Sequence, residues 1–79
     1  MEKISVKAAR INAGFTQGEI ADLLGVHVQT YLKFEQHPEK MTVKMANDFA
    51  RIVNKSVEAI YFLPSNSNLN RENKSYKEM

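Results

Sequence analysis

The feature that most constrains this chain is a pair of helical segments separated by little more than one glycine. The sequence Thr-Gln-Gly-Glu that begins at Thr16 is a capping box, in which the Thr16 hydroxyl serves a free amide of the first turn and Glu19 reaches back to the Thr16 amide. The segment that follows is apolar on one side until Gly25, and only Val26 separates Gly25 from a second periodic segment over residues 27–36. Because glycine adopts a positive φ without steric cost, the spacing predicts two helices joined by a very short turn.

The rest of the chain shows helical periodicity, with no alternation long enough to predict a strand. Ser5 caps a predicted first helix over residues 5–13, and Thr42 caps a predicted fourth helix. The apolar face of that fourth helix carries the following side chains: Val43, Ala46, Phe49, Ala50 and Val53. Ser56 begins a short fifth helix that is predicted to end near Phe62. The sequence therefore predicts an all-α fold of five helices.

Composition limits both the size and the class of the protein. A chain of 79 residues, 43% of them hydrophobic and 25% charged, holds one small globular domain. Residues 64–79 are rich in Ser and Asn and nearly free of apolar anchors, so we expect a disordered polar tail after a domain over residues 1–63. The absence of cysteine fits a reducing compartment, and no apolar run is long enough for a signal peptide or a membrane span. We expect a cytoplasmic, at most nucleoid-associated, protein with no membrane partner.

Two helices that meet at a fixed angle across a short turn form a helix-turn-helix arrangement. Ala21 lies where a small side chain lets the two helices approach, and larger apolar side chains would hold their angle: Ile20, Val26, Tyr31 and Phe34. The stretch from Gly14 to Glu35 resembles the Cro and repressor family of phage and bacterial regulators, and the resemblance extends over about residues 6–63. It implies a compact lambda-repressor-like domain that binds an operator in double-stranded DNA and regulates transcription, as a repressor of a phage or mobile element.

The resemblance also implies which side chains meet DNA, because the family places the helix over residues 27–36 in the major groove. With Thr30, Tyr31 and Phe34 on its core face, four outward positions are candidates for reading bases: Val28, Gln29, Leu32 and Lys33. Glutamine pairs with adenine, lysine donates to guanine and an apolar side chain meets a thymine methyl. The alternative for each is a solvated side chain or a phosphate contact. Five further residues are predicted to contact phosphates: Gln17, His27, Gln36, Lys40 and Lys44.

Four positions relate this chain to the family pattern in different ways. Arg10 and Glu35 match an ion pair that fixes the recognition helix to the scaffold, the alternative being two unpaired surface charges. His27 stands where the family often has a Ser or Thr cap, and histidine is a poorer cap. It is either a neutral surface ring or, when protonated, a phosphate contact that strengthens binding at lower pH. Tyr31 is bulkier than the aliphatic residue usual at its position.

The predicted fifth helix also suggests how two copies associate. It turns Val57, Ile60 and Tyr61 toward the core and leaves Phe62 and Leu63 near the surface. Exposed apolar side chains there predict a small interface in a weak homodimer that reads a palindromic operator.

Catalysis is not expected from this sequence. Two distant histidines without cysteine form no metal site, and no nucleophile has a visible base, so no enzyme activity, cofactor, metal or small-molecule ligand is predicted. The alternative function is a protein-binding module on the same fold, such as an antitoxin or an antirepressor.

Overall fold

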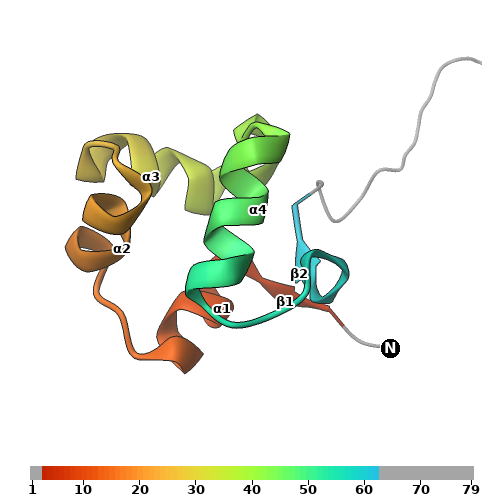
Figure 1. Ribbon diagram of the computed structural model, residues 1–79. Helices are drawn as coiled ribbons and strands as arrows, with labels where there is room; N and C mark the ends of the chain where they lie inside the picture. Colours follow the sequence, from red (N-terminus) through yellow and green to blue (C-terminus); the bar gives the residue numbers. More distant parts are fainter. Residues whose placement is uncertain (1–2, 63–79) are drawn as a thin grey trace, which may run out of the picture.

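In the computed structural model, which describes residues 3–62, the helices surround a small core and two short strands pair at one side (Figure 1). The described elements are β1 (Ile4–Ser5), α1 (Val6–Ala13), α2 (Gln17–Leu24), α3 (Val28–Gln36), the 3-10 turn η1 (Pro38–Lys40), α4 (Val43–Ile52), the 3-10 turn η2 (Val57–Ala59) and β2 (Ile60–Tyr61). The tail predicted for residues 64–79 lies outside the described residues.

Helix ends follow the local signals in the sequence. Ser5 Oγ accepts a hydrogen bond from the Ala8 amide at the start of α1, and both bonds of the capping box are present at the start of α2. Thr42 Oγ1 accepts from the Met45 amide in the same way at the start of α4. Because a cap side chain satisfies an amide that has no partner within the helix, each of these residues fixes where its helix begins.

The predicted fifth helix is wrong, because residues 57–61 form η2 and then β2. This strand runs parallel to β1, with Ile4 opposite Ile60. The strand alternates its side chains, so Ile60 is buried, Tyr61 is 46% exposed and Phe62 turns back to pack edge-on against Phe49, with ring centroids 6.3 Å apart. A helix of so few residues is marginal, whereas pairing with β1 satisfies backbone groups and still buries Ile60. The prediction that Phe62 is exposed and Tyr61 buried is therefore also wrong.

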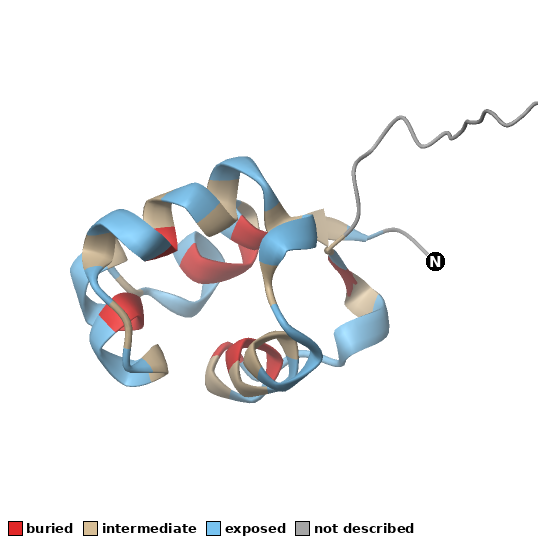
Figure 2. Cartoon of the chain, turned by 90° about the horizontal axis from the view of Figure 1, so that it is seen from above, coloured by how far each residue is buried: buried red, intermediate tan, exposed pale blue. Residues whose placement is uncertain are grey.

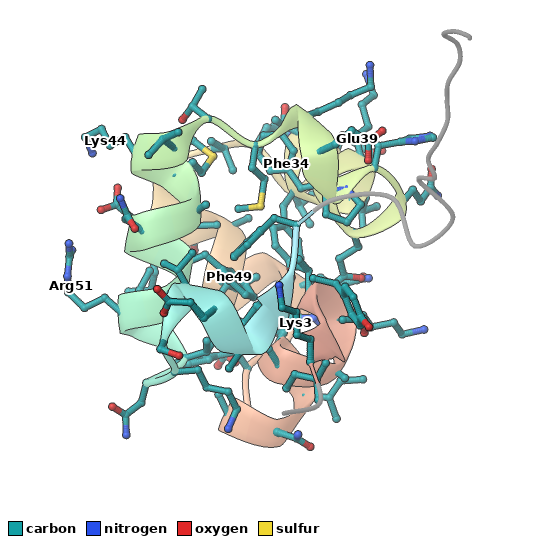
Figure 3. The ribbon with its side chains drawn as sticks, turned by 90° about the vertical axis from the view of Figure 1, so that its right-hand side faces the viewer. Lys3, Phe34, Glu39, Lys44, Phe49 and Arg51 are labelled. Carbon is teal, nitrogen blue, oxygen red and sulfur yellow. The ribbon has the colours of Figure 1, made fainter. Side chains whose placement is uncertain are left out.

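The core lies where α1, α2, α3 and α4 face one another, and the buried positions in Figure 2 lie on the inward sides of these elements. Tyr31 and Phe49 stack at its centre with their centroids 6.4 Å apart. Figure 3 shows Phe49 of α4 on the inner side of that helix, facing the part of the domain that holds Phe34 of α3, while Lys44 and Arg51 extend from the outer side of α4. Val43, predicted on the apolar face, is instead 80% exposed, because the first residue of α4 projects beyond the core. None of the described helices is long and apolar enough to cross a bilayer.

Candidate nucleic-acid interface

The turn between α2 and α3 is built as the sequence predicts. Gly25 adopts φ +76°, a left-handed conformation in which a residue with a side chain would be strained. The next amide, of Val26, donates to the Ala21 carbonyl at 3.0 Å and closes the end of α2. Ala21 itself is 1% exposed, as expected for a position where two helices meet closely. These contacts hold α3 at a fixed angle to α2.

The outer face of α3 differs in part from the prediction. Gln29, Lys33 and Gln36 are exposed, and Thr30, which the sequence placed in the core, is exposed as well. Val28, predicted to point outward, is partly buried and packs against the core, and Leu32 is half-buried. The buried stripe of α3 is centred on Tyr31 and Glu35. Val28 precedes these two residues by three and seven positions, so it shares their face and is turned away from the surface.

His27 caps α3, which the sequence left open. Its Nδ1 accepts a hydrogen bond from the Gln29 amide at 3.1 Å. A nitrogen that accepts this bond carries no proton, so the cap requires the tautomer with its proton on Nε2. A doubly protonated His27 would lose the cap, so this geometry opposes the predicted phosphate contact by a protonated ring.

The two lysines predicted to contact phosphates, Lys40 and Lys44, lie in different surroundings. Lys40 is exposed at the end of η1. Lys44, by contrast, donates through Nζ to Asp48 Oδ2 at 2.8 Å, and Arg51 Nη1 donates to Asp48 Oδ1 at 3.3 Å. We call these three side chains of α4 the Asp48 cluster. Because Asp48 holds both cations along the helix, the charge of Lys44 is already partly compensated. The Lys44 bond and the neighbouring cations hold the pKa of Asp48 below its usual value.

On the inner side, Arg10 and Glu35 form an ion pair, with Nε of Arg10 donating to Oε2 of Glu35 at 2.6 Å. The two side chains are only 9% and 7% exposed. The Tyr31 hydroxyl donates to the same oxygen at 2.7 Å, and Gln17 Nε2 donates to Oε1 at 3.2 Å. Arg10 Nη1 also donates to the carbonyl of Phe15, which precedes α2, at 2.8 Å. We call the side chains of Arg10, Gln17, Tyr31 and Glu35 the Glu35 network.

Electrostatics within the Glu35 network keep its groups in fixed protonation states. Burial on its own would raise the pKa of Glu35, but hydrogen bonds from Tyr31, Arg10 and Gln17 outweigh burial and hold that pKa below its usual value. Burial, together with the hydrogen bond to Glu35, raises the pKa of the Tyr31 hydroxyl far above its ordinary range. Glu35 is therefore a carboxylate and Tyr31 a protonated donor throughout the neutral range.

Sequence reasoning missed two members of this network. The Tyr31 hydroxyl explains why a tyrosine occupies a position where an aliphatic residue is usual, and its signal was the separation of four residues from Glu35, which puts both on one helix face. The bond from Gln17 to Glu35 had no local signal, because the two residues lie on different helices. Within residues 3–62, no group of three His, Cys, Asp or Glu side chains is arranged to hold a metal ion.

Helices α2 and α3, joined by the turn at Gly25 and held by the Glu35 network, form a helix-turn-helix unit. Comparison with known protein families supports this assignment. A family described as helix-turn-helix matches residues 6–60. No curated protein and no solved structure shows a significant match to the chain. The chain belongs to the helix-turn-helix family of the Cro and repressor type, whose members are DNA-binding transcriptional regulators.

Proposed function

We propose that this protein is a sequence-specific regulator of transcription that reads the major groove of double-stranded DNA with α3. The observation that carries the proposal is the outer face of α3, where polar and cationic side chains are exposed. His27 caps the start of this helix, and the ion pair of Glu35 with Arg10 attaches its inner face to α1. A rigid helix that presents such side chains can align them with base edges at small entropic cost. A role as repressor of a phage or mobile element is supported by the resemblance of residues 14–35 to Cro and repressor proteins.

Base reading is assigned to the exposed middle of α3. Gln29 can form two hydrogen bonds with adenine, and Lys33 can donate to guanine. Leu32, half-buried beside them, can meet a thymine methyl, and the Thr30 hydroxyl, which the structure exposes, can bond a base or a phosphate. Val28 drops out of this set because it packs against the core.

Phosphate contacts are assigned to the edges of the same face. Gln17 and the free amides of the first turn of α2 suit one phosphate, since exposed amides at a helix N-terminus attract anions. Lys40 and Gln36 lie toward the other end, beyond the base-reading residues, and both are exposed. Such contacts fix the register of α3 in the groove and carry no sequence information themselves.

Two copies of the domain would read a palindromic operator. A two-fold symmetric site requires the recognition helices to lie about 34–36 Å apart, in successive major grooves. We propose a weak homodimer that DNA reinforces by holding both subunits at once. Of the two residues predicted for its interface, Phe62 packs against Phe49 within its own domain and Leu63 lies outside the described residues. Sedimentation with and without a selected operator tests the dimer, and a one-to-one complex on a palindrome would contradict it.

Selection of preferred duplexes from a random pool, followed by titration with the full chain, tests the function. We expect one preferred sequence and a log-log salt slope of about −0.9 for each neutralised phosphate. Gln29→Ala should cost about 1–3 kcal/mol of discrimination at one base pair. Gln36→Ala, a matched glutamine on the same face, should weaken binding equally on all sequences. If no duplex is bound, the proposal fails, and the alternative of a protein-binding module becomes the hypothesis to test.

A further inference from the structure

Three helices each send a hydrogen-bond donor to the carboxylate of Glu35. Arg10 on α1 and Tyr31 on α3 share one carboxylate oxygen, Oε2, at 2.6 and 2.7 Å. Gln17 on α2 takes the other oxygen, Oε1, at 3.2 Å. Two of these donors therefore fix the plane of the carboxylate, and its second oxygen is left for Gln17.

We propose that Glu35 and Tyr31 are positioning residues for a phosphate contact made by the side chain of Gln17. The inference rests on the proposed function and adds the device that orients this contact before DNA arrives. A carboxylate only accepts hydrogen bonds, so the amide nitrogen of Gln17 must face Glu35. One of its two N–H groups makes that bond, and the other remains for an anion.

The value of this arrangement lies in conformational entropy. Fixing a free glutamine side chain costs rotamer entropy, and a surface glutamine would lose that freedom when it binds. Gln17 is half-buried and already bonded to Glu35, so the cost is met during folding. Binding to a phosphate then gains from a group that is already oriented.

The same ion pair also holds the backbone that leads into α2. Arg10 Nη1 binds the carbonyl of Phe15, two residues before Gln17. The Arg10–Glu35 pair thus holds both the backbone at the N-terminus of α2 and the side chain of Gln17. Because Glu35 belongs to α3, these groups are attached to α3 as well. The phosphate-binding end of α2 and the base-reading face of α3 are consequently fixed relative to each other.

Charge does not oppose a phosphate at this place. A lone carboxylate behind Gln17 would repel an anion, but Glu35 is paired with Arg10 at 2.6 Å. The pair carries almost no net charge as a whole. It therefore orients the side chain of Gln17 without repelling an anion bound there. Tyr31 adds a neutral donor and further spreads the charge of Oε2.

A double-mutant cycle on binding of the full chain to a random-sequence duplex tests the inference. Gln17→Ala should weaken binding about tenfold, as expected for loss of a hydrogen bond to a charged group, and should leave the salt slope unchanged because glutamine carries no charge. Tyr31→Phe should weaken binding several-fold while Gln17 is present and cause no further loss once Gln17 has been replaced. Tyr61→Phe, the same change at an exposed tyrosine, is the matched control and should leave binding unchanged.

The outcomes separate this inference from the proposed function. If the wild-type chain binds no duplex, the function fails and the inference with it. If it binds but the losses from Gln17→Ala and Tyr31→Phe multiply independently, only the inference is overturned. A second measurement uses the unmodified chain without DNA: one side-chain amide proton of Gln17 should be shifted downfield relative to those of Gln29 and Gln36 in a nitrogen-proton correlation spectrum. Equal shifts for all three glutamines would contradict the bond to Glu35.

Discussion

Two acidic residues of this domain each accept hydrogen bonds from several side chains, three at Glu35 and two at Asp48, yet their surroundings differ. Glu35 binds Arg10 at 2.6 Å with both side chains almost inaccessible to water. Asp48 binds Lys44 at 2.8 Å and Arg51 at 3.3 Å, with its own side chain 29% exposed and the two cations mostly in solvent. Hydrogen bonds lower the pKa of both acids against the opposing effect of burial. Burial is the largest single influence on the pKa of Glu35, whereas the bond from Lys44 is the largest influence on the pKa of Asp48.

The difference shows that similar distances do not imply similar energies. Removing Arg10 or Glu35 leaves the other as an uncompensated charge with little water to solvate it. Removing Asp48 leaves two cations that water solvates readily. The first group of side chains therefore determines how α1, α2 and α3 fit together, and the second mainly sets how much positive charge α4 offers to a partner.

The largest expected effect comes from breaking the buried pair. Arg10→Ala leaves Glu35 buried without its cation, and loss of one partner of such a pair costs about 3–5 kcal/mol. Urea unfolding followed by circular dichroism measures this change. Arg51→Ala, the same substitution in the Asp48 cluster, is the control and should move the midpoint little. Equal losses from the two substitutions would remove the distinction between the two regions.

A smaller loss is expected when only the hydroxyl of Tyr31 is removed. Tyr31→Phe keeps the ring stacked on Phe49 and deletes one hydrogen bond to a charged acceptor, which contributes about 1.5–3 kcal/mol. Tyr61→Phe serves again as the control, because Tyr61 is exposed and changes little on losing its hydroxyl. A stability of Tyr31→Phe equal to that of the wild type would mean that Arg10 alone satisfies Oε2.

Acid should reveal the same contrast. The pKa of Glu35 is lowered in the folded state, so as the pH falls the unfolded chain takes up this proton first. The stabilisation that is present above the ordinary pKa of a glutamate is lost as the pH falls through the lowered pKa of the folded state. Unfolding free energies measured from about pH 6 down to pH 2 should fall steeply for the wild type. Tyr31→Phe removes one of the hydrogen bonds that lower this pKa, so its curve should be flatter. An unchanged slope would place the acid sensitivity elsewhere.

The smallest effect on stability, and the opposite effect on binding, is expected from Asp48→Asn. The free energy of unfolding should stay within experimental error, because the Asp48 cluster is exposed. Binding to a random duplex should become tighter, since Lys44 and Arg51 are released to meet phosphates, and the log-log salt slope should steepen by about 0.9 for each new contact. Glu58→Gln makes the same change of net charge on η2 and controls for it. Equal gains from both variants would attribute the effect to overall charge.

Local chemistry explains which parts of this fold could be predicted. The starts of α1, α2 and α4 depend on side chains within three residues of the cap, and the turn at Gly25 depends on one backbone angle. The β1–β2 pair depends on residues at the two ends of the described chain. The short apolar stretch that contains β2 was therefore predicted as a helix, because its partner strand lies far away in the sequence. Periodicity assigned a recognition helix but misplaced its rotation by enough to exchange Val28 and Thr30.

The site was predictable to a similar extent. Resemblance to the family supplied Arg10 and Glu35 as partners, and the structure contains that ion pair. It could not supply the bond from Gln17, or the attachment of Lys44 to Asp48, because both depend on rotamers chosen by neighbours in space. Side chains assigned to DNA from their sequence position alone can thus already be occupied within the protein.

The parallel pairing of β1 with β2 also bears on the order in which the domain folds. Ile4 meets Ile60 only after a loop that contains every α-helix has closed, whereas α2 and α3 meet across a single tight turn. Chain entropy disfavours the longer closure until other contacts shorten it, so we expect the two strands to join late and to separate first under mild denaturant. Such partial opening would release Phe62 from Phe49 while leaving α3 attached to α1 and α2. We therefore expect the β1–β2 pair to open and close without disturbing the surface proposed to read DNA.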